Sequence, residues 1–250
     1  MRSKLQTAFA WLGLIIMAVC VVWFESLPRA PRVLETVTPT RPETFPIVVV
    51  DPGHGGQDSG AMCAGMMEKD LTFDVAQRLD RLLRESGIST LMTRGGDNYI
   101  SLVDRAAMTN RLHDCVLVSI HFNEGNKPVS TGIETYYAEH QSGSAPLLAS
   151  WFPFLQRASS DPANLQSQSL AGFIQDALVR RTHAVNRGTK TQQFFVLANV
   201  RHPAVLVEGG FISNKDDADK LVSPEYREEI AAAINDGILQ YRDVLKGGRQ

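Results

Sequence analysis

The sequence predicts an α/β domain with a mostly parallel, twisted sheet of about six strands flanked by helices on both faces. Three observations predict it. Short β-branched runs, typical of strands buried on both faces, alternate with segments of helical periodicity. The globular part has about 200 residues, enough to bury one sizeable core. Polar residues directly follow several predicted strands, where sites in open α/β sheets lie.

The elements follow in order from residue 47. Residues 47–50 are a continuous Ile/Val run and form the first predicted strand. Apolar residues then recur at helical spacing from Leu71 to Leu82, and Gly87 is a typical helix stop. Five further strands are predicted, at 88–92, 116–120, 133–138, 194–197 and 204–207. Three further helices are predicted: one at 101–113, which begins with Ser101 and Asp104, one at 169–181, and one that begins with Ser223 and Pro224.

Composition excludes several classes of protein. Hydrophobic residues make up 44% and charged residues 21% of the 250, as in an ordinary globular protein. Lys plus Arg number 25 against 27 Asp plus Glu, so the net charge of −2 predicts no nucleic-acid partner. Three cysteines exclude a disulfide scaffold, and the sequence leaves open whether Cys63 pairs with Cys115.

The N-terminal segment predicts export. Residues 5–24 carry no charge and follow Arg2 and Lys4, and about 20 such residues are needed to span a bilayer. We therefore expect a membrane-anchor helix within residues 1–27, with a cleaved signal peptide as the alternative. Residues 28–46 are rich in Pro and Thr and predict an extended linker. The folded domain is predicted at 47–246, outside the cytoplasm.

Three residues from separate elements predict a metal site. His54 lies among glycines after the first strand, Glu68 precedes a helix, and His121 follows a buried strand. Two histidines and one carboxylate are the protein ligands of one type of catalytic zinc site, which leaves a fourth position for water. The alternative is that these histidines only satisfy hydrogen bonds of loops and strand ends.

Glu208 directly follows the core-like run 204–207, where a carboxylate is costly unless it is paired or functional. One interpretation is a general base beside a metal-bound water. The other is an ion pair with Arg187 or Arg201.

Six motifs together resemble the zinc-dependent N-acetylmuramoyl-L-alanine amidases of the amidase-3 type. They occur in the family's order, between about residues 47 and 245. The motifs are Asp-Pro-Gly-His-Gly-Gly (51–56), Glu-Lys-Asp (68–70), Ser-Ile-His-Phe-Asn (119–123), Gly-Ile-Glu-Thr-Tyr-Tyr (132–137), Asn-Arg-Gly (186–188) and Pro-Ala-Val-Leu-Val-Glu-Gly-Gly-Phe-Ile-Ser-Asn (203–214).

The resemblance implies one zinc ion per chain, held by His54, Glu68 and His121, with Glu208 catalytic. It also implies hydrolysis of the amide between N-acetylmuramic acid and L-alanine in bacterial peptidoglycan, for cell-wall remodelling, daughter-cell separation or lysis. The expected location is the cell envelope, anchored in the cytoplasmic membrane. A catalytically silent wall-binding module and a zinc peptidase acting on stem peptides are the alternatives.

Several further residues match family positions. Asn123, Glu134 and Arg187 are expected either to contact substrate or to support the residues that do. The alternative for Asn123 and Glu134 is that they only hold the local hydrogen-bond network. Arg187 and Lys190 are candidates to meet anionic groups of the stem peptide, and a solvated or structural role is the alternative.

Residues 140–168 form a long connection whose apolar residues recur at helical spacing. Some relatives in the family have an inserted helix that blocks the site until an activator moves it. Because this insert is shorter than theirs, a lid that only partly gates the zinc cleft and responds to a protein activator is one interpretation, and a helix packed permanently on the core is the other.

Overall fold

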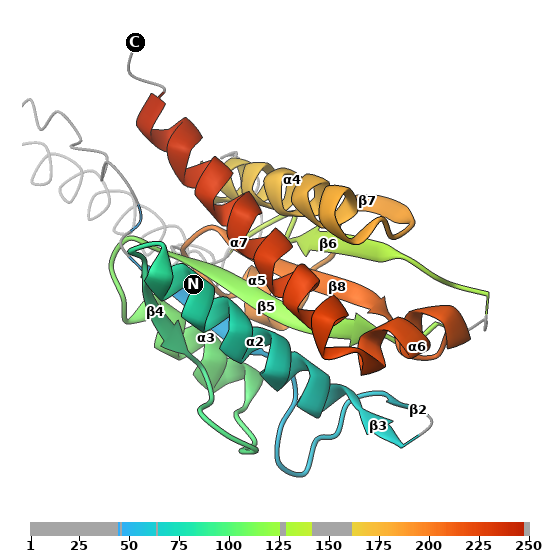
Figure 1. Ribbon diagram of the computed structural model, residues 1–250. Helices are drawn as coiled ribbons and strands as arrows, with labels where there is room; N and C mark the ends of the chain where they lie inside the picture. The colour runs from blue at the N-terminus through green and yellow to red at the C-terminus, as the bar shows by residue number, and fades with distance from the viewer. Residues whose placement is uncertain (1–44, 46, 64, 126–128, 142–161, 248–250) are drawn as a thin grey trace, which may run out of the picture. The chain divides into compact units, whose positions relative to one another are not determined.

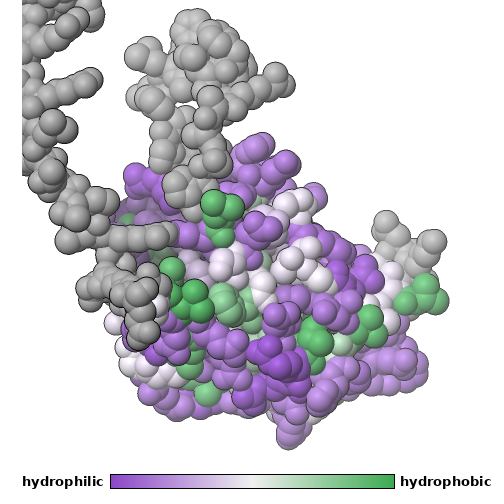
Figure 2. Space-filling model, turned by 90° about the horizontal axis from the view of Figure 1, so that it is seen from above, coloured by the Kyte–Doolittle hydropathy of each residue, from purple (hydrophilic) through white to green (hydrophobic). Residues whose placement is uncertain are grey.

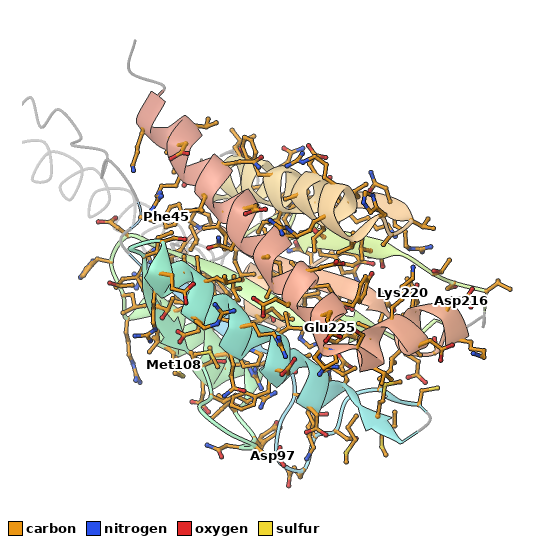
Figure 3. All side chains as sticks on the ribbon, in the orientation of Figure 1. Phe45, Asp97, Met108, Asp216, Lys220 and Glu225 are labelled. Atoms are coloured by element: carbon orange, nitrogen blue, oxygen red, sulfur yellow. The ribbon has the colours of Figure 1, made fainter. Side chains whose placement is uncertain are left out.

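The computed structural model describes residues 45, 47–63, 65–125, 129–141 and 162–247. The predicted anchor lies outside the described residues, and so do most of the predicted linker and most of the segment 140–168. Among the helices of the described part, none is both long enough and apolar enough to cross a membrane. Phe45, near the end of the predicted linker, stacks on Tyr241 with ring centroids 5.7 Å apart, and it is labelled in Figure 3.

A six-stranded sheet forms the centre of the domain (Figure 1). The strands are β1 (Ile47–Pro52), β4 (Ser89–Met92), β5 (Cys115–Asn123), β6 (Ile133–Tyr137), β7 (Asn186–Thr191) and β8 (Ala204–Phe211). Their spatial order is β4-β1-β5-β8-β6-β7, and all neighbours are parallel except β6 with β8. The mostly parallel sheet predicted from the sequence is thus confirmed. A small hairpin, β2 (Met62–Cys63) with β3 (Met66–Met67), precedes the first long helix.

Helices cover both faces of the sheet. They are α2 (Glu68–Glu85), α3 (Leu102–Asn110), α4 (Pro162–Thr182), α5 (Phe195–Ala198), α6 (Lys215–Val222) and α7 (Pro224–Gly247). Figure 1 shows α2, α4 and α7 in front of the sheet and α3 and α5 behind it. The buried side chains divide in the same way, because Val48 and Val50 belong to the core cluster of α2, α4 and α7, whereas Val49 lies in the cluster of α3 and α5.

Helix ends agree with the sequence signals. The Ser101 hydroxyl accepts a hydrogen bond from the Asp104 N–H at 3.1 Å, which caps α3. Pro224 is the first residue of α7, as predicted, and the Ser223 hydroxyl accepts a long hydrogen bond from the Tyr226 N–H at 3.4 Å.

One predicted strand was wrong. Residues 194–197 do not pair in the sheet, and residues 195–198 instead form the short helix α5. A run of four apolar residues fits a buried strand and a buried helical turn equally well, so periodicity alone cannot separate them. The sixth strand is β7, whose Asn-Arg-Gly-Thr-Lys-Thr sequence carries no apolar pattern because β7 is a mostly exposed edge strand. Helix α6 was also not predicted.

The Cys63–Cys115 pair does not form, and both residues are free thiols. Cys115 is buried at the start of β5, where burial raises the pKa of its thiol to about 12. It therefore behaves as a small apolar side chain of the core.

Candidate active site

A row of polar residues crosses the sheet. His121 on β5 is in register with Glu208 on β8, and Glu208 is in register with Glu134 on β6. Residues directly opposite on neighbouring strands project to the same face. Because Leu206 of β8 belongs to the cluster of α3 and α5, the row lies on the face that those two helices cover. Glu208 is not the end of its strand, since β8 continues to Phe211.

Glu68 connects the two histidines. Its Oε1 lies 2.9 Å from His121 Nδ1 and 3.1 Å from His54 Nε2, and one ligand atom from each of the three residues lies within 4.8 Å of the others. Burial alone would raise the pKa of Glu68, but hydrogen bonds with His121 and His54 outweigh it and lower the pKa. The structure thus brings the three predicted ligands together around one ionised carboxylate.

Two glycines allow this close approach. A Cβ on Gly53 would lie 2.3 Å from His121 Cε1, and a Cβ on Gly60 would lie 2.6 Å from both Glu68 Oε2 and His54 Cδ2. Such distances are far below van der Waals contact, so any other residue would displace the imidazoles or the carboxylate. The glycine-rich sequence around His54 therefore makes room for the site as well as for the turn.

His54 has an unusual backbone conformation that its surroundings maintain. Its φ of 59° is in the left-handed region, which few non-glycine residues adopt. Arg105 Nη2 donates to the His54 carbonyl at 2.6 Å, and Arg94 Nη2 donates to the Gly53 carbonyl at 3.0 Å. On the imidazole, His54 Nδ1 lies 2.9 Å from Asp58 Oδ2. These contacts fix the loop and the ring, with Nε2 facing Glu68.

The loop is also held from outside. Asp97 lies in the loop that follows β4 and is labelled in Figure 3. Its carboxylate accepts hydrogen bonds from the Gly56 N–H at 2.7 Å and from Lys69 Nζ at 2.8 Å.

Asp51 belongs to this supporting structure and is not one of the three grouped residues. Its buried carboxylate accepts hydrogen bonds from Thr93 Oγ1 at 2.6 Å, Ser119 Oγ at 2.7 Å and Arg105 Nη1 at 2.6 Å. The side chains of Asp51 and Arg105 are 1% and 4% exposed, so their ion pair is desolvated.

Glu208 differs from the buried acids around it, because it is partly exposed and lines the cleft. Its Oε2 is inaccessible to solvent and has no hydrogen-bond partner among the described residues. Burial, followed by the negative charges of Glu68 and Glu134, raises the pKa of Glu208. The alternative interpretation, an ion pair of Glu208 with Arg187 or Arg201, is not found, because Arg187 Nε donates to Glu134 and Arg201 Nη2 donates to the Asn110 carbonyl.

Glu134 is the centre of a second polar cluster. Its Oε1 accepts from Asn123 Nδ2 at 2.8 Å and from the Tyr136 hydroxyl at 2.6 Å. Its Oε2 accepts from Arg187 Nε at 2.7 Å and from Lys190 Nζ. Burial raises the pKa of Glu134, but these hydrogen bonds and charges outweigh burial and lower it. The structure therefore joins the predicted residues Asn123, Glu134 and Arg187 in one network.

The histidines open into a cleft with a volume of about 380 Å³. Polar lining comes from His54, Glu68, His121, Asn123, Glu124 and Glu208, and the rest of the lining forms a largely apolar wall. Leu102 of α3 and Phe194 and Phe195 at α5 form that wall, which sequence reasoning missed because it took 194–197 for a strand. In Figure 2, which shows the molecule from above, hydrophobic side chains lie in small groups among hydrophilic ones.

Residues 48–240 match the family model of the N-acetylmuramoyl-L-alanine amidases. The chain belongs to this family. The enzyme hydrolyses the amide bond between N-acetylmuramic acid and L-alanine in peptidoglycan, the polymer of the cell wall. The family assignment does not agree with the alternative function, that of a peptidase that acts on stem peptides.

Individual relatives agree with the family assignment. The amidase is 34% identical over 194 residues to N-acetylmuramoyl-L-alanine amidase LytC of Bacillus subtilis; the match covers 78% of this chain but only 35% of LytC. Among solved structures, the N-acetylmuramoyl-L-alanine amidase from Clostridium difficile 630 is 33% identical in sequence to this chain and superposes with a TM-score of 0.67. The match covers 80% of this chain and 98% of that one. The CwlD amidase from Clostridioides difficile, in complex with the GerS lipoprotein, is 26% identical, with a TM-score of 0.67, over 79% of this chain and 98% of CwlD.

Sequence reasoning missed three residues around the site. Asp58, Arg94 and Arg105 all contact the His54 loop or its imidazole. Asp58 could have been found, because it lies four residues after His54 inside the same glycine-rich motif. The two arginines carry no local signal, since their burial depends on the packing of α3 and of the loop after β4.

Proposed function

We propose that the amidase is zinc-dependent, with one zinc ion held by His54, Glu68 and His121. The supporting observation is the meeting of two imidazole nitrogens and one carboxylate oxygen from three separate elements within 4.8 Å. That donor set suits zinc and leaves a coordination position open. Two further features fit the ion. A divalent cation beside Glu208 would oppose the rise of its pKa, and the Asp58 contact holds the His54 ring as supporting residues do in metal sites.

The proposed role of Glu208 is general base and then general acid. Zinc, when bound, polarises the substrate carbonyl and increases the acidity of water. Glu208 lies beside His121 with an unpaired Oε2, so it can accept a proton from the attacking water. The C–N bond then breaks, and the same carboxyl group gives the proton to the departing alanine nitrogen. The products are the muramoyl carboxylate and a peptide with a free amino group.

The cluster around Glu134 is proposed to support this chemistry from the neighbouring strand. Asn123 lines the cleft and donates to Glu134, whose position is fixed by Arg187 and Lys190. Because Glu134 is in register with Glu208, its negative charge helps to keep the pKa of Glu208 raised.

Removing one histidine should remove the metal. We expect the wild-type amidase to contain close to one zinc ion per chain, and His54→Ala or His121→Ala to lose most of it, because two protein ligands rarely hold zinc in an open site. Zinc can be measured by elemental analysis after dialysis, and amide cleavage on purified peptidoglycan by the new amino-terminal alanine.

His183→Ala is the matched control, since His183 follows α4 and is not among the residues that line the cleft. It should retain both zinc and activity. Wild-type zinc content in both ligand variants would contradict the proposed site.

Peptidoglycan lies outside the cytoplasmic membrane, and we propose that residues 1–27 anchor the amidase there. The support is the uncharged stretch 5–24 behind Arg2 and Lys4. We expect the enzyme to stay with membranes during an alkaline carbonate wash and to have the mass of the uncleaved chain. Release by carbonate at full length would contradict anchoring, and a mass lower by about the first 27 residues would identify a cleaved signal peptide.

A protein partner that controls activity is also proposed. Its support is the related CwlD amidase, which was solved in complex with the GerS lipoprotein.

A further inference from the structure

We propose that Arg187 and Lys190 of β7 form a binding site for the free carboxylate on the second residue of the stem peptide. This inference rests on the proposed function and names the substrate group that the enzyme selects. In peptidoglycan the second residue is a glutamate linked through its side chain, so its α-carboxyl group is either free or converted to a carboxamide. The proposed site distinguishes these two forms.

The charge of the cluster favours an anion. Glu134 brings one negative charge, and Arg187 and Lys190 bring two positive charges, which leaves an excess of one. The Glu134 side chain is 2% exposed, whereas those of Arg187 and Lys190 are 33% and 38% exposed. Glu134 therefore holds the two cations from the buried side, and both cations remain accessible to a ligand from solvent.

Both cations are held in place before substrate arrives. The Arg187 guanidinium lies over the Phe211 ring at 4.8 Å, and Lys190 Nζ lies 5.8 Å from the centre of the Tyr136 ring. Each cation also donates to Glu134 Oε2. Side chains restrained in this way lose little conformational entropy on binding, which increases the affinity available from a charged contact.

The distance to the reacting bond fits the second residue. β7 lies two strands away from β8, which carries Glu208, and two steps between strands are about 10 Å between Cα atoms. The pairing of β6 with β7 shifts in register next to Glu134, so Arg187 and Gly188 both lie opposite Glu134. Glu134 is in turn in register with Glu208. An extended peptide advances about 3.5 Å per residue, so a carboxylate two residues from the scissile amide lies about 7 Å away. A long Arg or Lys side chain covers the remaining distance.

Other cations do not compete for this role within the cleft. None of the described residues that line it is a lysine or an arginine, and the wall near α5 is apolar. Asn123 lines the cleft and is hydrogen-bonded to Glu134, so the cluster adjoins the cleft at this side.

The test is a competition between two substrates in one mixture. Glycan strands that carry stems with a free carboxylate on the second residue are mixed with strands that carry the carboxamide, and mass spectrometry follows the released peptides. The ratio of products gives the ratio of kcat/KM values. We expect the wild-type amidase to prefer the carboxylate about tenfold, the size of one charge-assisted hydrogen bond. Arg187→Gln should bring the ratio close to one, and because both substrates compete in one mixture, any effect of the lost Glu134 contact on catalysis slows both and cancels in the ratio.

Two further variants separate binding from support of the fold. Arg187→Lys keeps the charge and should retain at least half of the preference, and Lys190→Gln should reduce it about threefold. Arg84→Gln, on the exposed end of α2, changes the net charge equally and should leave the ratio unchanged.

Equal cleavage of both substrates by wild type would overturn the proposal, and so would an Arg187→Gln variant that keeps the wild-type ratio. If wild type cleaved neither substrate, the amide hydrolysis on which the inference rests would fail, so the two failures are distinguishable.

Discussion

Replacing Glu208 with glutamine is expected to slow amide hydrolysis by about 10²–10⁴-fold, the usual contribution of general acid–base catalysis. The amide of glutamine keeps the shape of the side chain but cannot accept the proton of water or return it to the leaving nitrogen. Zinc content and the unfolding transition should stay at wild-type values, because Glu208 is not one of the three grouped ligands and its Oε2 makes no hydrogen bond within the described residues. Cleavage is measured as new amino-terminal alanine on purified peptidoglycan.

Glu229→Gln is the matched control, because Glu229 is exposed on α7 and the substitution is chemically the same. It should be fully active. An active Glu208→Gln enzyme would show that a different group takes the proton, and a Glu208→Gln enzyme without zinc would place Glu208 among the ligands.

Replacing Arg105 with methionine is expected to lower the free energy of unfolding by about 3–5 kcal/mol. Removing one partner of a buried ion pair leaves the other charge, here Asp51, desolvated and unpaired. The same substitution removes the donors to the Pro52 and His54 carbonyls, so the left-handed backbone of His54 loses a restraint. Urea unfolding at saturating zinc measures the first effect, and zinc titration measures a weaker affinity from the second.

Arg84→Met provides the comparison, because Arg84 is exposed and its ion pair with Asp80 lies at the surface. Its loss should cost less than about 1 kcal/mol. The double variant Asp51→Leu/Arg105→Met should be more stable than Arg105→Met alone, since it leaves no unpaired charge. A cost below about 1 kcal/mol for Arg105→Met would contradict a stabilising role of this pair.

Much of the fold could be predicted from sequence because core strands and amphipathic helices carry their own patterns. Residues 47–50 are apolar on both faces, and they pair on both sides in the sheet. β7 shows where this reasoning stops. Its pairing with β6 is a contact between distant segments, and an exposed edge strand needs no apolar residues of its own.

The residues of the candidate site could also be predicted only in part. His54, Glu68 and His121 could be grouped because their residue types suit one metal and each follows or precedes a predicted element, and the structure places them together. Their function as ligands and that of Glu208 as a base remain predictions. Arg94 and Arg105 could not be found, because an arginine in a loop or short helix is normally solvated, and only the folded domain buries these two.

The row of His121, Glu208 and Glu134 has a consequence for how the enzyme becomes active. Its members come from three strands and from positions up to 87 residues apart, so the row exists only when all three strands are correctly aligned. Side chains alternate along a strand, and a slip of β5 by one residue would turn His121 to the opposite face of the sheet. A misaligned chain would therefore lack both a complete metal site and a base beside it, so a chain with partial or incorrect strand pairing cannot cut the cell wall.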